Sequence, residues 1–150
     1  MAIIAILILF LCSCDVQLNW NPQGDWIYPI QHGYCIVRVN NVDIKLCVAK
    51  PISEGQSTYL HVVDEYIISF SYNDSFIAVK RLTIDEDATF EEIMAMDVDQ
   101  AQYYLVNAEN RMVFGPFAEQ SEFDNICTEQ DVGTLGEWID TYPAPSGAEF

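Results

Sequence analysis

Hydrophobic and polar side chains alternate on either side of Asn73-Asp74, in two short runs that fill residues 66–81. Such alternation is typical of paired β-strands, and asparagine and aspartate tolerate the backbone of a tight turn. With a two-residue loop, one face of this hairpin carries Ile68, Phe70, Tyr72, Ser75, Ile77 and Val79. That face is the more hydrophobic one, so the pattern predicts a sheet that packs on a core from one side.

A second hairpin is predicted over residues 34–48, around Asn40-Asn41. Pairing outward from a two-residue loop places Cys35 opposite Leu46 on the inward face and turns Cys47 outward. A loop with an odd number of residues would instead place Cys35 opposite Cys47. The two-residue loop is the prediction, and the odd-length loop stays open as its alternative.

A third hairpin is predicted over residues 103–117, with its loop inside 107–110. One of its faces carries Tyr103, Leu105, Met112 and Phe114. After Arg81 the composition becomes acidic, and a short helix is predicted over 89–96 because Thr89 and Glu92 have the spacing of a capping box.

A C-terminal helix is predicted over residues 117–130, where Phe123, Ile126 and Cys127 recur at helical spacing and face the core. Together these elements predict an α+β fold: an antiparallel β-meander of three hairpins with a C-terminal helix packed on one face. The predicted domain organisation is a signal peptide at 1–13, a lipid-proximal tether at 14–25, a single globular domain at 26–141 and a flexible tail at 142–150.

The first eleven residues are apolar and uncharged, and they run into Cys12-Ser13-Cys14. Eleven residues are too few to span a membrane, which takes about 20, but they match the hydrophobic region of a secretory signal. The segment 11–14 resembles the bacterial lipobox, which implies that Cys14 is lipidated and becomes the mature N-terminus. The absence of Lys and Arg from the start, and the cysteine at position 12, depart from that pattern. The predicted location is the bacterial cell envelope, lipid-anchored on the extracytoplasmic side of the membrane.

The formal net charge is −17. Such a surface repels phosphate backbones, so nucleic acid is excluded as a partner, whereas a basic protein partner would be attracted. High solubility is the alternative interpretation of the same charge.

The chain has five cysteines, of which Cys35, Cys47 and Cys127 remain after the predicted processing. Exported domains favour disulfides, and the register above predicts that a bridge, if one forms, is Cys35–Cys127 with Cys47 free. The alternatives are a Cys35–Cys47 bridge, which needs the odd-length loop, and three buried thiols without a bridge.

Aromatic residues are the candidate binding surface, namely Trp20, Trp26, Tyr28, Tyr66 and Tyr72, although packing at the edge of the core is the alternative role. No catalytic residue, cofactor site or metal site is predicted, because the sequence has no H-x-x-x-H or C-x-x-C pair, no phosphate-binding loop and no nucleophile elbow. The acidic stretch 85–99 lacks the glycine of a calcium loop and is interpreted as a solvated face. The chain is therefore not predicted to be an enzyme.

Four motifs follow one another in a fixed order: G-Y-x-I at 33–36, D-I-x-L at 43–46, Y-N-D-S-F-I-A-V-K at 72–80, and Y-Y-L-V-N with V-F-G-P-F inside 103–117. In this order they resemble a family of small bacterial lipoproteins known only as a domain of unknown function, over about residues 33–130. The resemblance implies a location and a fold, and no activity. The functional expectation is a membrane-tethered extracytoplasmic binding or structural module of unknown ligand. The alternative is an acidic immunity-type inhibitor that neutralises a basic toxin.

Overall fold

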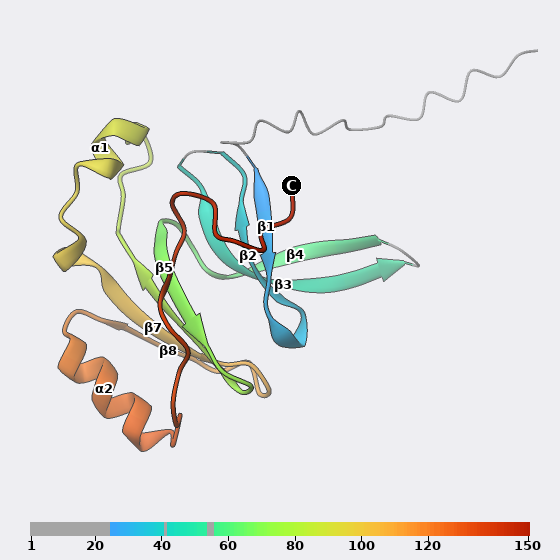
Figure 1. Ribbon diagram of the computed structural model, residues 1–150, viewed down its shortest axis with the longest axis vertical. Coiled ribbons are helices and arrows are strands. Elements are labelled where there is room, and N and C mark those ends of the chain that lie inside the picture. The colour runs from blue at the N-terminus through green and yellow to red at the C-terminus, as the bar shows by residue number, and fades with distance from the viewer. Residues whose placement is uncertain (1–24, 41, 54–55) are drawn as a thin grey trace, which may run out of the picture.

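The computed structural model describes residues 25–40, 42–53 and 56–150, and within these ranges it contains two antiparallel sheets and a C-terminal helix (Figure 1). The first sheet has the order β1-β2-β3-β4, formed by β1 (Trp26–Pro29), β2 (Tyr34–Arg38), β3 (Ile44–Ser53) and β4 (Gln56–Val63). The second has the order β8-β7-β6-β5-β9, formed by β5 (Ile67–Tyr72), β6 (Phe76–Arg81), β7 (Gln102–Asn107), β8 (Val113–Phe117) and β9 (Ile139–Asp140). The helices are α1 (Phe90–Met94) and α2 (Gln120–Glu129), with short 3-10 turns η1 (Gln31–Gly33) and η2 (Val98–Gln100).

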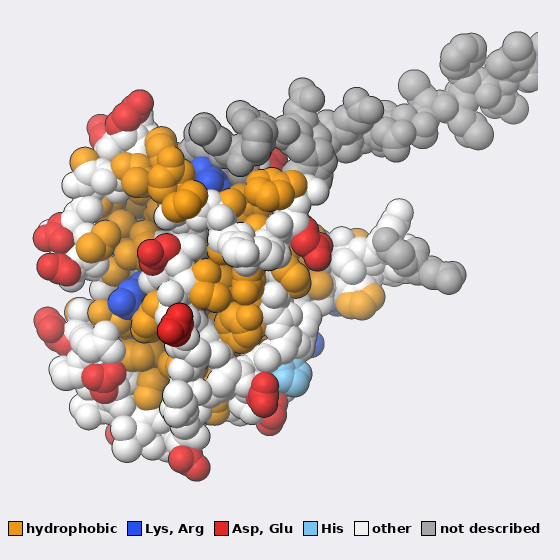
Figure 2. All heavy atoms as spheres, viewed as in Figure 1, with side chains coloured by type: hydrophobic (Ala, Val, Ile, Leu, Met, Phe, Trp, Pro, Cys, Tyr) orange, Lys and Arg blue, Asp and Glu red, His pale blue; other side chains and the backbone are white. Residues whose placement is uncertain are grey.

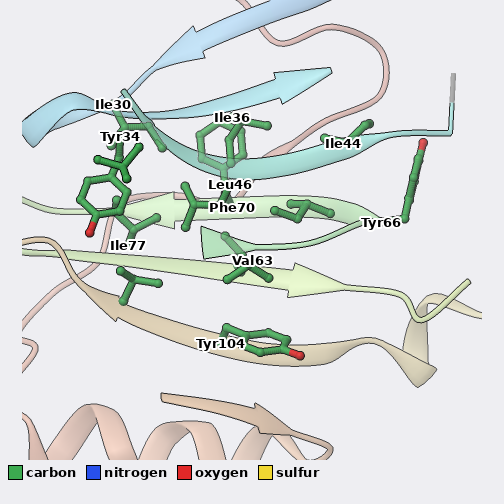
Figure 3. Close-up of a cluster of buried hydrophobic side chains, with 14 of the residues drawn as sticks. Ile30, Tyr34, Ile36, Ile44, Leu46, Val63, Tyr66, Phe70, Ile77 and Tyr104 are labelled. Atoms are coloured by element: carbon green, nitrogen blue, oxygen red, sulfur yellow. The ribbon is translucent and has the colours of Figure 1, made fainter. Parts of the chain in front are cut away.

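The main hydrophobic core lies between the two sheets. Figure 3 shows Ile36 and Leu46 of the first sheet facing Phe70 and Ile77 of the second, and all four side chains are fully buried. The alternation of apolar residues predicted for 66–81 is therefore used to pack one sheet against another. The α+β fold class is confirmed, with the meander divided into two sheets.

The helix α2 covers one end of the outer face of the second sheet. Its Phe123 is buried against Phe76, Ala78 and Leu105, and Ile126 and Cys127 pack beside it. The predicted helix and its core-facing residues are confirmed. In the third hairpin Tyr103, Leu105 and Phe114 share the face that α2 covers, whereas Met112 belongs to the turn and is exposed.

The hairpin of β5 and β6 has a longer loop than predicted. Tyr72 pairs with Ile77, because Asn73 closes the turn by accepting hydrogen bonds on Oδ1 from the backbone N–H groups of Ser75 and Phe76, at 3.0 and 2.9 Å. The pairing is displaced by two residues from the prediction. A displacement of two leaves the side chains of residues 69–80 on their predicted faces while their partners change, but a bulge between Ile67 and Ser69 buries Ile67, rather than the predicted Ile68, in the main core.

The hairpin of β2 and β3 has the odd-length loop. The N–H of Val39 donates to the carbonyl of Asp43 at 3.0 Å, and Cys35 lies directly opposite Cys47. The predicted register is therefore wrong by one residue, which exchanges the faces of β2, whereas on β3 Leu46 points inward and Cys47 outward as predicted. Tyr34, Ile36, Leu46 and Val48 point into the core between the sheets, and both cysteines point to the other side.

The predicted bridge between Cys35 and Cys127 is wrong. Cys35 lies on the outer face of the first sheet, whereas Cys127 lies under α2 on the outer face of the second, so both sheets separate them. The three cysteines in the described ranges are free thiols, and those of Cys35 and Cys47 are buried.

The prediction of a flexible tail over 142–150 is also corrected. In Figure 1 the C-terminal segment runs along β5 and then reaches β1. Its residue Glu149 pairs with Ile27 through two backbone hydrogen bonds of 2.9 and 2.7 Å, and Ala144 and Ala148 pack on the main core. Proline and small residues suggested a chain without core contacts, but an unpaired strand edge gives such a segment partners for its backbone.

Candidate functional site

The outer face of the second sheet is covered by α2 at one end only. At the other end Ser69 of β5, Lys80 of β6 and Tyr103 of β7 line a cavity of about 470 Å³. Cavities that bind small molecules have volumes of roughly 300–1,000 Å³. The walls come from α1 and the residues after it, from η2, and from the end of β9 with the segment that follows, and they include Met94, Met96, Val98, Asp99, Asp140 and Tyr142.

A β-bulge shapes the cavity floor. Between Ile67 and Ser69 the register of β5 against β6 shifts, so that Ile67 is buried in the main core while Ile68 lines the cavity. Thr141 holds the bulge from the side. Its N–H donates to the carbonyl of Ile68 at 3.0 Å, and its buried hydroxyl lies 2.8 Å from the carbonyl of Ile67.

The positive charge in the cavity belongs to Lys80. Its Nζ lies 4.5 Å from the ring centre of Trp138 and 5.4 Å from that of Tyr103. Both rings attract the ammonium through their electron-rich faces. Among the described residues no carboxylate forms a salt bridge with Lys80. The two rings therefore fix the ammonium in place without neutralising its charge.

The wall formed by α1 begins at a well-formed helix cap. Thr89 and Glu92 form the predicted capping box, and the hydrogen bonds from the backbone and side chain of Thr89 lower the pKa of the Glu92 carboxyl. Ile93 anchors the helix in the core, while Met94 and Val98 are exposed beside the cavity, Val98 with 62% of its surface accessible. The predicted acidic helix thus also supplies an apolar wall.

Tyr142 also lines the cavity, and its ring meets that of Phe90 edge-on with 5.6 Å between the ring centres. The guanidinium carbon of Arg38 lies 5.8 Å from the centre of the Tyr142 ring. Tyr66 lines the cavity beside it with only 3% of its surface exposed. Burial raises the pKa of the Tyr66 phenol, and the nearby Arg38 opposes that shift. Tyr66 is therefore a neutral phenol over the whole physiological pH range.

The lining of the cavity is mixed in its chemistry. It combines apolar side chains with one ammonium, from Lys80, and two carboxylates, from Asp99 and Asp140, and the lining as described includes no histidine or cysteine. Across the described part of the chain, no group of three or more potential ligand side chains could hold a metal ion. Within the same ranges no helix is long and apolar enough to cross a membrane.

The predicted aromatic binding surface is not formed. Trp26 is 1% exposed, and Tyr28 and Tyr72 pack around Phe70 between the two sheets, with their hydroxyls 3.3 Å apart. The hydrogen bond to Tyr72, together with burial, raises the pKa of Tyr28 to about 12. These residues have the alternative, core-packing role, because their strands face the other sheet. Tyr66 alone of the set lines the cavity, and Trp20 and Cys14 lie outside the described residues.

Sequence reasoning missed Lys80, Trp138 and Asp140 as site residues. The sequence signal for Lys80 was its position directly after the uncharged run Phe76–Val79, on a strand predicted to pack on the core. Trp138 and Asp140 gave no usable signal, because their position depends on the pairing of β9 with β5, which joins segments far apart in the chain.

Comparison with known proteins identifies a family for the chain. No curated protein and no solved structure matches. A family described as "Protein of unknown function (DUF3997)" matches residues 31–135. This range contains Lys80, Tyr103 and α1, while the wall formed by residues 140–142 lies beyond it. It also agrees with the range of the resemblance noted in the sequence, whose lipoprotein character stays a prediction. The match covers well over half of the chain, which therefore belongs to the DUF3997 family, whose function is unknown.

Proposed function

We propose that this protein is a lipid-anchored, extracytoplasmic binding module and that the cavity over Lys80 is its ligand site. The observation that carries the proposal is the ammonium of Lys80, held between Trp138 and Tyr103 on the floor of a cavity that α2 leaves uncovered. A lysine with a purely structural role would be expected to pair with one of the many carboxylates of this chain.

The lining favours a small amphipathic ligand that carries both signs of charge, such as a short peptide. An anionic group would meet Lys80, an apolar body would lie along Met94 and Val98, and an amine would be accepted by Asp99 or Asp140. A polyanion is disfavoured by the net charge of −17.

The Lys80→Met variant tests this site. It keeps the length and the apolar stem of the side chain, so the packing against Trp138 is largely retained while the charge is lost. A charge-assisted hydrogen bond contributes about 1.5–3 kcal/mol, so the affinity for a binding dipeptide, found by thermal-shift screening of a dipeptide library, should fall roughly 10- to 100-fold in calorimetry. Lys50→Met is the matched control, because Lys50 is exposed on β3 outside the cavity. Equal affinities of the two variants would show that Lys80 does not contribute to ligand binding.

The anchoring part of the proposal rests on the sequence before Asp15. Cells that express the full chain should incorporate labelled palmitate into it, and Cys14→Ser should abolish the label. Intact mass of the membrane-fraction protein should begin at an acylated Cys14. Recovery of unprocessed protein in the cytosol would contradict this part without bearing on the cavity.

The acidic surface supports a second candidate function, inhibition of a basic toxin. Figure 2 shows acidic side chains spread over the visible face, with hydrophobic side chains exposed between them. Such a surface accelerates association with a cationic partner, and the rate falls as salt is added. A toxin gene next to the gene for this chain would favour the inhibitor, whereas an envelope operon would favour the binding module.

A further inference from the structure

The two sheets have four outer edges, and three of them are protected. The edge at β1 is paired with Glu149. The edge at β9 is only two residues long, and β8 carries Gly115-Pro116, which interrupts the row of backbone donors. Short strands, proline and covering segments are the usual means by which proteins prevent pairing with other chains at a sheet edge.

The fourth edge, β4, has none of these protections. Its eight residues, Gln56–Val63, contain no proline, glycine, lysine, arginine, aspartate or glutamate. Within the described ranges it pairs with β3 alone. Pro51 lies opposite Ser57 and has no N–H to donate. This fits a non-hydrogen-bonded pair of the antiparallel ladder, in which the backbone groups of both residues point away from the other strand. By the alternation of an antiparallel ladder, Ser57 and Tyr59 then present their backbone groups to the open edge.

We propose that β4 pairs antiparallel with β4 of a second copy of this chain, which joins the two first sheets into one continuous sheet. A twofold contact brings a surface against itself, so any charge near the axis meets its own like charge. Because β4 contains no aspartate, glutamate, lysine or arginine, it avoids that repulsion, although the chain as a whole carries 23 acidic residues. The contact would also cover Tyr59 and Leu60, whose side chains are exposed on this strand.

The shape of the molecule reduces the repulsion between the two acidic bodies. In Figure 1 the hairpin of β3 and β4 projects away from the rest of the protein. Residues 49–53 of β3 extend beyond its last pairing with β2, at Val48. At about 3.4 Å per residue this arm reaches roughly 17 Å, against a screening length of about 8 Å at physiological ionic strength. The arm can therefore meet its copy while the acidic bodies remain screened from each other.

Photo-crosslinking of the full chain in bacterial membranes tests the pairing. Tyr59 is replaced by benzoylphenylalanine, which keeps an aromatic side chain at the edge, and the product is identified by intact mass. The expected product has twice the mass of the chain. Adding Ser57→Pro, which removes one donor at the open edge, should reduce this product at least tenfold, while Ser57→Ala, which retains the donor, should leave it unchanged.

Each other outcome overturns the proposal. No crosslink, or adducts with a different protein, would show that a second copy does not occupy β4. A dimer product that persists in Ser57→Pro would show that the contact does not use the strand edge. Thermal unfolding of the Ser57→Pro variant separates loss of pairing from loss of folding, and the crosslink in the otherwise unchanged chain decides the partner by itself.

Discussion

The hydroxyl of Thr141 links the C-terminal segment to the bulge beneath the cavity, and its removal should cost a measurable part of the stability. Thr141 is buried, and its Oγ1 lies 2.8 Å from the carbonyl of Ile67 and 3.1 Å from that of Ile68. Thr141→Val keeps the branched shape of the side chain and replaces only the hydroxyl. The variant therefore reports on the hydrogen bond with little contribution from a packing defect.

The size of the stability loss in Thr141→Val depends on which carbonyl is left without a hydrogen-bond donor. The carbonyl of Ile68 still accepts from the N–H of Thr141 at 3.0 Å, so it remains satisfied. Residues 66 and 82 exchange backbone hydrogen bonds, so the next residue, Ile67, points its carbonyl away from β6 and toward Thr141. An unsatisfied buried acceptor costs about 1–3 kcal/mol. At about 2–4 °C per kcal/mol for a chain of this size, the melting temperature should fall by roughly 4–8 °C for a loss near 2 kcal/mol.

Urea unfolding monitored by tryptophan fluorescence measures the loss of free energy of unfolding. Thr83→Val is the matched control, because the hydroxyl of Thr83 is exposed and its contact with Gln102 is 3.4 Å long. The control should stay within about 0.5 kcal/mol of the unaltered protein. If Thr141→Val also stays within that range at an unchanged denaturant slope, the hydroxyl does not hold the bulge, and the account of the cavity wall fails.

Two further predictions concern the packing and the buried thiols. Phe123→Ala should lower the free energy of unfolding by about 3–5 kcal/mol, because Phe123 fills the space under α2. The control Phe150→Ala, at an exposed site, should change it little. Similar losses for the two variants would contradict the assigned packing. Burial raises the pKa of Cys35 to about 12 and that of Cys47 to about 11, from 9.0 in an exposed thiol. Between pH 9 and these values only the unfolded state loses the protons, so stability should fall with rising pH across that window and fall less steeply in the double variant Cys35→Ala/Cys47→Ala. Equal slopes for the two proteins in urea unfolding between pH 8 and 10.5 would refute the role of the thiols.

The strands of the three predicted hairpins and the two helices were predictable because their signals are local, whereas β1, β4 and β9 were not predicted. The apolar periodicity of 66–81 and the capping box at Thr89 depend on neighbours in the chain, and both are confirmed. The length of a loop is a weaker signal. The side chain of Asn73 supports a longer turn than the two-residue loop predicted at Asn73-Asp74. The wrong loop length gave the wrong cross-strand partners but did not change which face of the sheet the side chains occupy. At Asn40 an error of one residue exchanged the faces of β2 and therefore placed Cys35 on the wrong side of the sheet.

The candidate site was beyond sequence reasoning because three distant segments form it. Lys80 comes from a central strand, Val98 from the acidic stretch and Trp138 from the region after α2. The pairing of Phe70 with Ile139 brings the last of these into place, and no local pattern predicts a strand of two residues. The aromatic residues chosen from the sequence were conspicuous by type, but their strands carry most of them into the core.

The C-terminal segment also has a consequence for the order of folding. Strands β1–β4 and β5–β8 each pair with their neighbours in the chain, so these pairings close short loops, except that β6 and β7 are joined by the segment 82–101. The contacts of Ile139 with Phe70 and of Glu149 with Ile27 instead join segments far apart in the chain. Closing a longer loop costs more entropy, and contacts between distant segments form more slowly. The wall of the cavity therefore closes among the last steps of folding, and a chain whose two sheets are already paired does not yet have a complete ligand site.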